Sequence, residues 1–204
     1  CFSTNSKKLY AVNPLKGTLH IWDISSAKHE NQLSINRSVQ LTQLVPLDEN
    51  IIFIATLNGD VWNLNLKKKK LSLLHKPSIN DRDPLYIHSM VFDQKSSQLN
   101  LIRGNGSVEF LGYQGEQITK VTRIELKYDV RCAAFSKDFA NFAIADWNNN
   151  VNVLLTNDSK PVRKIKLDEN IYDLAFGLTK DLLIISQDVG TCLGINTKNA
   201  QVNW

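Results

Sequence analysis

Long apolar runs are missing from this chain, and cysteine is scarce. No apolar stretch in the 204 residues approaches the roughly 18 residues that a helix needs to cross a bilayer, so we expect no membrane span. The three cysteines, Cys1, Cys132 and Cys192, are odd in number and far apart, and the last two fall in expected strands. This pattern favours buried free thiols over a disulfide framework. No signal peptide is visible, and we expect an intracellular protein, either cytoplasmic or nuclear.

The residue clusters that catalytic and metal sites require are also lacking. None of the four histidines has a second histidine or a cysteine two to five residues away; they are His20, His29, His75 and His88. The segment 104–106 begins like a phosphate-binding loop, but no third glycine follows, which indicates a tight turn between strands. The acidic pair Asp81 and Asp83 is interpreted as solvated rather than as a general acid and base. We expect no enzyme activity, no cofactor and no metal ion.

Charge of one sign is not in large excess. The chain has 24 Lys and Arg against 20 Asp and Glu, a net charge of +4, which is well short of a dedicated nucleic-acid-binding domain. No interleaved aromatic platform for single-stranded nucleic acid is visible. These absences exclude several classes of function without indicating a specific one.

What the sequence does contain is a repeat. A turn that ends in Gly or Asn, followed by a polar residue and an apolar strand, occurs five times, at intervals of 42, 47, 43 and 41 residues. The turn residues of the five copies are Gly17, Gly59, Gly106, Asn149 and Gly190. A period in the forties that is built from short strands is typical of propeller blades.

A second pattern keeps the same spacing. Before four of the turns, an apolar strand runs into a polar turn, and the steps between its copies are 47, 43 and 41 residues; the copies centre on Val45, Phe92, Phe135 and Phe176. Each period reads as four strands, which in the third unit cover 86–92, 98–102, 107–111 and 118–126. Apolar clusters without strict alternation suit sheets that are buried on both faces. We therefore predict an all-β fold.

The repeat resembles the WD40-repeat family over essentially the whole chain. Only Trp22-Asp23 reproduces the family's Trp-Asp pair, and the Gly-His dipeptide of the family is missing from every unit. The resemblance implies a WD40-like β-propeller with about five four-stranded blade units in this chain, at approximately 1–38, 39–84, 85–126, 127–169 and 170–204. The first unit lacks its opening strand and the last stops inside its fourth. Because such propellers usually close with seven blades, we expect the remaining blades to come from the same, longer chain or from a partner.

The resemblance also implies where binding residues lie. The loops between second and third strands gather on one face with the loops that link successive blades. On that face we expect a protein-binding surface with Trp147, Arg103, Arg82 and Asp188. Trp147 at a loop tip is either a binding anchor or a ring that folds back over a neighbouring blade. Arg82 and Arg103 are either forked donors for a carboxylate or phosphate, or simply solvated charges.

The single charge run consists of Lys67, Lys68, Lys69 and Lys70, and we expect it at a hairpin tip on the opposite face. Mutual repulsion favours four solvated ammonium groups. The alternative is a patch that contacts phosphates of RNA, DNA or an anionic membrane, with Arg163, Lys164 and Lys166 as basic neighbours.

Two functions remain as expectations. The first is a non-catalytic scaffold for protein–protein interaction, a subunit of a larger intracellular complex. The second is a propeller subunit of a ribonucleoprotein or chromatin-associated assembly, such as one in ribosome biogenesis, which contacts nucleic acid through the lysine run. A third, a small-molecule or enzymatic propeller, needs polar groups that converge on a central channel, and the sequence does not indicate any.

Overall fold

The computed structural model describes residues 1–35, 40–78, 83–156, 158–179 and 181–202. These residues form antiparallel β-strands joined by turns. The strands are β1 (Lys8–Asn13), β2 (Thr18–Asp23), β3 (Lys28–Ser34), β4 (Leu41–Pro46), β5 (Ile51–Thr56), β6 (Val61–Asn65), β7 (Lys70–His75), β8 (Ile87–Asp93), β9 (Gln98–Arg103), β10 (Ser107–Gln114), β11 (Gln117–Glu125), β12 (Val130–Phe135), β13 (Asn141–Asp146), β14 (Asn150–Leu155), β15 (Pro161–Lys166), β16 (Ile171–Phe176), β17 (Leu182–Gln187), β18 (Cys192–Asn196) and β19 (Gln201–Val202).

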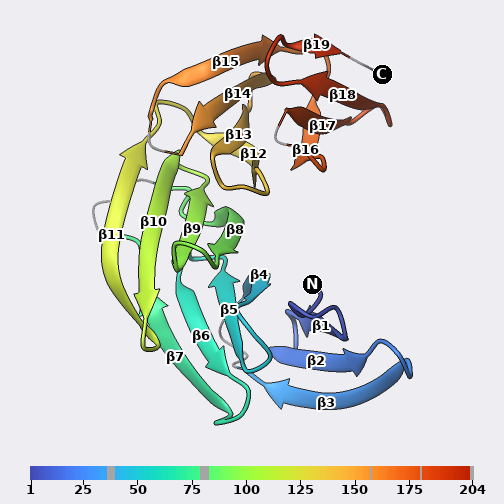
Figure 1. Cartoon of the computed structure of the whole chain (residues 1–204), viewed down its shortest axis with the longest axis vertical. Coiled ribbons are helices and arrows are strands. Elements are labelled where there is room, and N and C mark those ends of the chain that lie inside the picture. Colours follow the sequence, from blue (N-terminus) through green and yellow to red (C-terminus); the bar gives the residue numbers. More distant parts are fainter. Residues whose placement is uncertain (36–39, 79–82, 157, 180, 203–204) are drawn as a thin grey trace.

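The strands assemble into five sheets in sequence order. The first sheet has three strands, β1–β2–β3, and the other four have four strands each, β4–β7, β8–β11, β12–β15 and β16–β19. Figure 1 shows the sheets following one another along an arc, with β1 at one end and β19 at the other. The all-β prediction is confirmed, and the four strands expected in the third unit match β8 to β11 to within three residues.

Apolar residues hold adjacent sheets together. Each of the four core clusters takes its side chains from two neighbouring sheets, because the strands present buried residues on both faces. Between the first and second sheets, for example, Tyr10 and Leu19 pack with Ile52 and Leu64. The sheets therefore form one continuous packed array.

The first strands of the four four-stranded sheets, which we call the inner strands, share one irregularity in their pairing. In β4, β8, β12 and β16 the register with the next strand shifts by one residue near the strand's start, as expected of a β-bulge. The bulged residues are Thr42, His88, Arg131 and Tyr172. A bulge changes the direction of the side chain that it contains. The four bulges occupy equivalent positions in their sheets but contain four different residue types.

Residues 1 and 2 pair with β1 of the first sheet in the way that the end of β12 pairs with β13. Phe2 bridges Leu9, and Cys1 and Tyr10 exchange two backbone hydrogen bonds of 2.8 Å each. This bridge repeats the pairing of Phe135 with Phe142 in the fourth sheet. Phe2 also precedes Val45 by 43 residues, so it is a further copy of the second sequence pattern, which our sequence interpretation missed.

The cysteines are free, as expected, but they are not equally buried. Cys132 in β12 is buried, whereas Cys1 and Cys192 are exposed. The prediction of buried thiols is therefore wrong for Cys1 and Cys192. Cys192 is exposed because β18 belongs to the last sheet of the arc, which has a neighbouring sheet on one side only.

Candidate interaction surfaces

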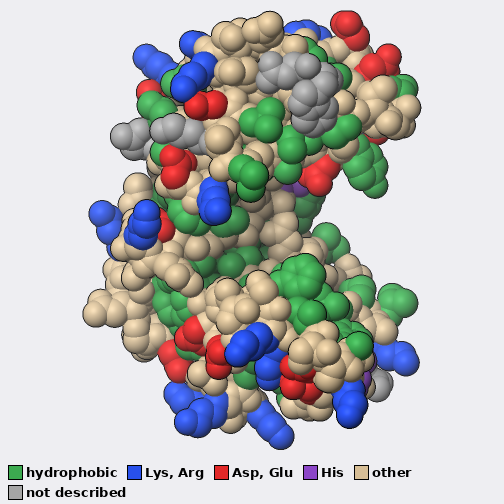
Figure 2. Space-filling view, turned by 45° about the vertical axis from the view of Figure 1, so that its right-hand side comes forward, with side chains coloured by type: hydrophobic (Ala, Val, Ile, Leu, Met, Phe, Trp, Pro, Cys, Tyr) green, Lys and Arg blue, Asp and Glu red, His purple; other side chains and the backbone are tan. Residues whose placement is uncertain are grey.

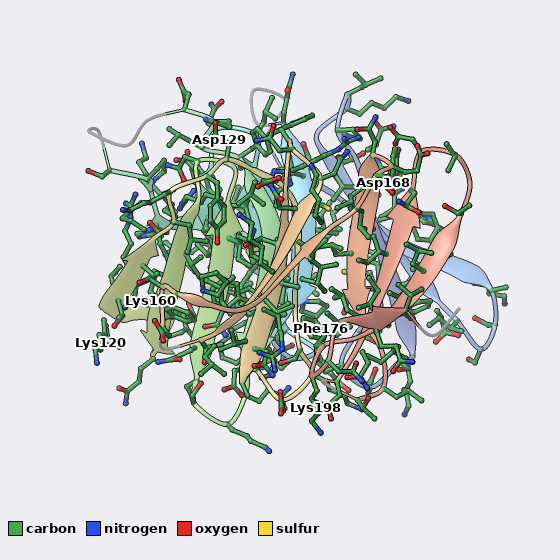
Figure 3. The ribbon with its side chains drawn as sticks, turned by 90° about the horizontal axis from the view of Figure 1, so that it is seen from above. Lys120, Asp129, Lys160, Asp168, Phe176 and Lys198 are labelled. Atoms are coloured by element: carbon green, nitrogen blue, oxygen red, sulfur yellow. The ribbon has the colours of Figure 1, made fainter. Side chains whose placement is uncertain are left out.

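The turns of the arc lie on two opposite faces. Figure 3 shows Asp129 and Asp168 at one edge of the sheets and Lys160, Phe176 and Lys198 toward the other. We call the first the linker face, since it carries the segments that join successive sheets, and the second the hairpin face. The turn at 147–149 belongs to the linker face, because Leu167 N donates to Asn149 O over 3.1 Å.

Trp147 is exposed on the linker face, at the tip of the turn after β13. Its side chain is 59 % exposed. The turn itself is fixed by Asp146, whose Oδ1 accepts hydrogen bonds from Asn148 N and Asn150 N, both at 2.9 Å. The ring contacts the guanidinium of Arg131, whose Cζ lies 5.2 Å from the ring centroid. Trp147 is thus held against its own sheet by a cation–π contact and still presents most of its surface to solvent.

Arg131 also reaches the next sheet. Its Nη2 lies 3.5 Å from Oδ1 of Asp188, in the exposed turn after β17. Asp188 N donates to Asn170 O over 3.0 Å, which fixes that turn beside the linker into β16. Trp147, Arg131 and Asp188 therefore form one group, the linker-face cluster, which joins the fourth and fifth sheets. Sequence analysis singled out Trp147 and Asp188 but missed Arg131, because its position depends on the bulge in β12.

Arg103 differs from the expectation of an exposed donor. Its side chain is fully buried, and its Nη1 donates to the carbonyl oxygens of Gly59 at 2.7 Å and Leu85 at 3.1 Å. Its Nε and Nη2 donate to Oε2 of Glu109 at 3.1 and 2.9 Å. With these donors occupied inside the molecule, Arg103 is a contact between the second and third sheets rather than a binding residue. Arg82 lies outside the described residues.

Glu109 is the centre of this buried polar group. Besides Arg103, it contacts Nε2 of His75 at 3.0 Å and Nη1 of Arg123 at 3.5 Å. Burial alone would raise the pKa of Glu109, but the hydrogen bond from His75 and the charge and hydrogen bonds of Arg103 outweigh it and lower the pKa to about 2. This buried group of charged side chains lies between the apolar clusters of the second and third sheets.

The lysine run lies on the hairpin face, where it was expected. Lys67, Lys68 and Lys69 form the turn between β6 and β7, Lys70 begins β7, and all four are exposed. Nζ of Lys68 lies 3.1 Å from Oε1 of Glu116, and this hydrogen bond lowers the pKa of Glu116.

The basic residues of β15 belong to another sheet. Arg163 Nε donates to Lys198 O over 2.8 Å, and Lys166 Nζ donates to Asn148 O.

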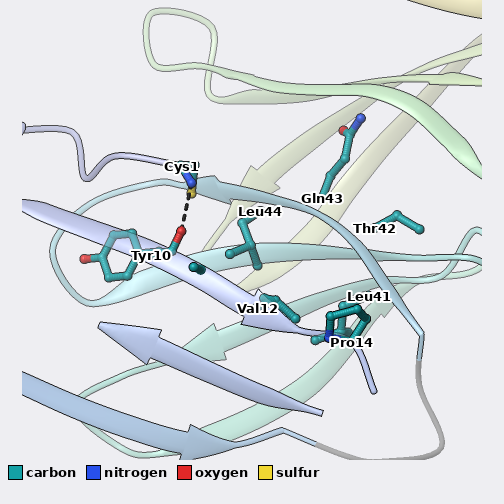
Figure 4. A pocket seen from close by; sticks show the side chains of 9 residues that line it. Cys1, Tyr10, Val12, Pro14, Leu41, Thr42, Gln43 and Leu44 are labelled. Atoms are coloured by element: carbon teal, nitrogen blue, oxygen red, sulfur yellow. Dashed lines mark hydrogen bonds between the residues drawn. The ribbon is translucent and has the colours of Figure 1, made fainter. Parts of the chain in front are cut away.

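The concave side of the arc is largely apolar. Figure 2 shows hydrophobic side chains along the hollow, with charged side chains mostly toward the two lobes. A pocket of about 400 Å³ lies between β1 and β4. Figure 4 shows the residues that line it, most of them apolar, together with Gln43. Nε2 of Gln43 donates to His88 O over 2.6 Å, and Nε2 of His88 contacts Val130 O at 2.7 Å. These contacts link three successive inner strands.

Among the described residues, no group of three His, Cys, Asp or Glu side chains is placed to hold a metal ion. In the same part of the chain, no helix is long and apolar enough to cross a membrane.

Comparison with known proteins gives no further assignment. A scan against protein-family models finds no family that matches the chain, and a search of curated proteins finds no match.

Proposed function

We propose that this protein is a non-catalytic scaffold for protein–protein interaction, a WD40-type propeller subunit of a larger intracellular complex. The observation that carries the proposal is the linker-face cluster. An exposed tryptophan is held in place by Arg131, and Arg131 is held by Asp188. Tryptophan and arginine are the residues most enriched where alanine substitution costs binding energy.

The cluster suits binding because it is already ordered. Asp146 fixes the backbone of the Trp147 turn, and the contact with Arg131 holds the ring, so less conformational entropy is lost when a partner covers the ring. Val189 and Tyr172, both exposed, lie in the Asp188 turn and at the bulge of β16, respectively, and extend the apolar surface of the linker face.

The experiment is affinity purification of the protein from its native cells, with and without nuclease, followed by mass spectrometry. Protein partners that survive nuclease support the scaffold.

The Trp147→Ala variant should then weaken partner binding about tenfold or more. Leu178→Ala is the matched control, because Leu178 is 92 % exposed in a turn on the hairpin face. Equal binding by both variants would contradict the assignment of the linker face.

A second candidate is a subunit of a ribonucleoprotein or chromatin-associated assembly. The observation that favours it is the exposed turn of Lys67 to Lys69, in which only Lys68 has a described carboxylate partner. Replacing Lys67 to Lys70 by glutamine should weaken nucleic-acid binding and flatten its salt dependence, since fewer counterions are released. Partners that disappear with nuclease, together with this loss, would favour the second candidate over the first.

Closure of the arc is part of the proposal. Further sheets, from the same chain or from a partner, would cover the outer sides of the first and fifth sheets. Exposed apolar residues on those sheets support this, among them Phe2, Ile24 and Val202. Analytical ultracentrifugation of the 204-residue chain should show self-association. A monodisperse monomer that unfolds cooperatively would contradict the need for further sheets.

A further inference from the structure

The outer side of the first sheet, which lies at one end of the arc (Figure 1), carries two histidines and a tryptophan in mutual contact. In β2, Leu19 and Ile21 belong to the core that the first sheet shares with the second. His20 and Trp22 alternate with them along the strand and therefore lie on the opposite side of the sheet. His29 of β3 joins them there, with its ring centroid 5.3 Å from that of His20.

A β-bulge brings His29 to this side. Ile21 pairs with Asn31, but the next residue of β2, Trp22, pairs with His29, so β3 has one extra residue at this point. Without the bulge, Trp22 would pair with Glu30, and His29 would face the second sheet. The two imidazoles therefore meet because of a local irregularity in the pairing of β2 with β3.

Neither the strands nor the bulge requires histidine. The fourth sheet has the same shift between its third and fourth strands, and there Asn152 and Pro161 occupy the positions of His20 and His29. The same backbone thus forms elsewhere in the chain with other side chains. The imidazoles of His20 and His29, which we call the histidine pair, are an addition that the fold does not need.

The spacing of the histidine pair fits two ligands of one metal ion. Nδ1 of His20 and Nε2 of His29 are 3.2 Å apart. Imidazole nitrogens bind ions such as Zn²⁺ at about 2.0–2.1 Å, so this separation corresponds to an angle of about 100° at the ion, between the square-planar and tetrahedral values. His29 is exposed, so its ring can turn to direct the Nε2 lone pair at the ion.

Thr18 holds the ring of His20 in a suitable state. Oγ1 of Thr18, a buried residue, lies 3.1 Å from Nε2 of His20. When Nε2 carries the proton and donates to Thr18, Nδ1 keeps its lone pair for a metal ion. Metal-binding histidines usually donate their other ring N–H to a neighbouring acceptor, which fixes the tautomer and the orientation of the ring.

We propose that His20 and His29 bind one divalent transition-metal ion of the kind that prefers imidazole ligands, such as Cu²⁺ or Zn²⁺. Among the described residues no third His, Cys, Asp or Glu completes the site, so water occupies the remaining positions in the free chain. The inference does not depend on the proposed scaffold function, because the site lies on the first sheet and shares no residue with the linker-face cluster.

The test is a titration of the 204-residue chain with Cu²⁺. Cys1 and Cys192 are first replaced by serine, because exposed thiols are themselves metal ligands. The Trp22 ring lies 5.5 and 5.2 Å from the rings of His20 and His29, so its fluorescence should be quenched and saturate at one ion per chain. Electron paramagnetic resonance should show coupling to two imidazole nitrogens. Quenching that does not saturate, or coupling to one nitrogen only, would overturn the proposal.

Variants separate a shared site from two independent histidines. His20→Gln and His29→Gln should each weaken Cu²⁺ binding at least tenfold, and the double variant should bind no more weakly than either, because a two-ligand site needs both rings. Thr18→Val removes no ligand and should still weaken binding about tenfold. Gln32→Ala is the control, because Gln32 pairs with His20 across the strands without belonging to the site. Additive losses in the two histidine variants, or an equal loss in Gln32→Ala, would indicate an adventitious ion only and overturn the site.

A second measurement does not depend on fluorescence. An ion that binds the folded chain stabilises it, so saturating Zn²⁺ should raise the Tm of the wild type and leave that of His29→Gln unchanged. Mg²⁺ prefers oxygen ligands and should have no effect at the same concentration. Equal shifts with the two ions, or an equal shift in His29→Gln, would contradict coordination by the histidine pair.

Discussion

Arg103 and Glu109 form a buried ion pair, with Nη2 of the arginine 2.9 Å from Oε2 of the glutamate and neither side chain open to solvent. The same arginine donates to two backbone carbonyls, those of Gly59 and Leu85. One side chain therefore links the turn of the second sheet, the segment before β8 and the strand β10. This contact ties two repeats together at a place where charged side chains would otherwise be destabilising.

Removing the arginine should be strongly destabilising. Arg103→Ala leaves Glu109 with one cationic partner fewer in a buried place, and we expect a loss of about 3–5 kcal/mol in the free energy of unfolding. Urea titration measures it. Arg163→Ala is the control, because Arg163 is exposed in β15, and a change of about 0.5 kcal/mol or less is expected there. Equal effects of the two variants would contradict the role of Arg103.

The pKa of Glu109 predicts a specific acid sensitivity. Its folded value of about 2 lies below the ordinary value of 4.5, so the ionised form is favoured by folding. The stabilisation is fully present above pH 4.5 and is lost as the pH falls through about 2, and by linkage it amounts to about 3 kcal/mol. Urea titrations between these pH values should show a steeper loss in the wild type than in Glu109→Gln. Parallel curves would contradict this assignment.

Much of the fold was predictable from the sequence because its determinants are local. The repeated turn and the apolar strands that follow it depend on a few adjacent residues, and Asn149 indeed takes the positive φ (59°) that Gly59 and Gly106 take in other copies. The burial of Arg103 was not predictable in this way. Its partners are two backbone carbonyls and Glu109, which the fold alone brings together.

The residues of the candidate sites show the same difference between local determinants and contacts that only the fold creates. Trp147 and Asp188 were found because turn tips can be located from the repeat. Arg131 was missed because a one-residue bulge in β12 sets its direction.

The three thiols should react at different rates. Burial, together with the nearby charge of Asp173, raises the pKa of Cys132 to about 12, so its reactive thiolate is scarce at neutral pH. Cys1 and Cys192 are exposed. Iodoacetamide should label these two in the native protein and all three in denaturant, as read by peptide mass spectrometry. Native labelling of Cys132 at the rate of Cys192 would contradict the packing of β12 against β16.

Two glycines with nearly the same backbone conformation should respond differently to alanine. Gly59 and Gly190 have φ values of 80° and 79°, so the backbone term is the same for both, about 1–2 kcal/mol. A Cβ on Gly190 meets nothing within 4 Å, whereas on Gly59 it would lie 2.4 Å from Leu85 O and 2.5 Å from Arg103 Nη1. Gly59→Ala must therefore displace the carbonyl and the guanidinium that join the second and third sheets. We expect this overlap to lower the free energy of unfolding by roughly a further 1–3 kcal/mol and to weaken the hydrogen bonds of Arg103. Urea titration should thus give a clearly larger loss for Gly59→Ala than for Gly190→Ala. Equal losses would mean that the sheets can shift at this junction and that the contact of Arg103 with the Gly59 turn is not required.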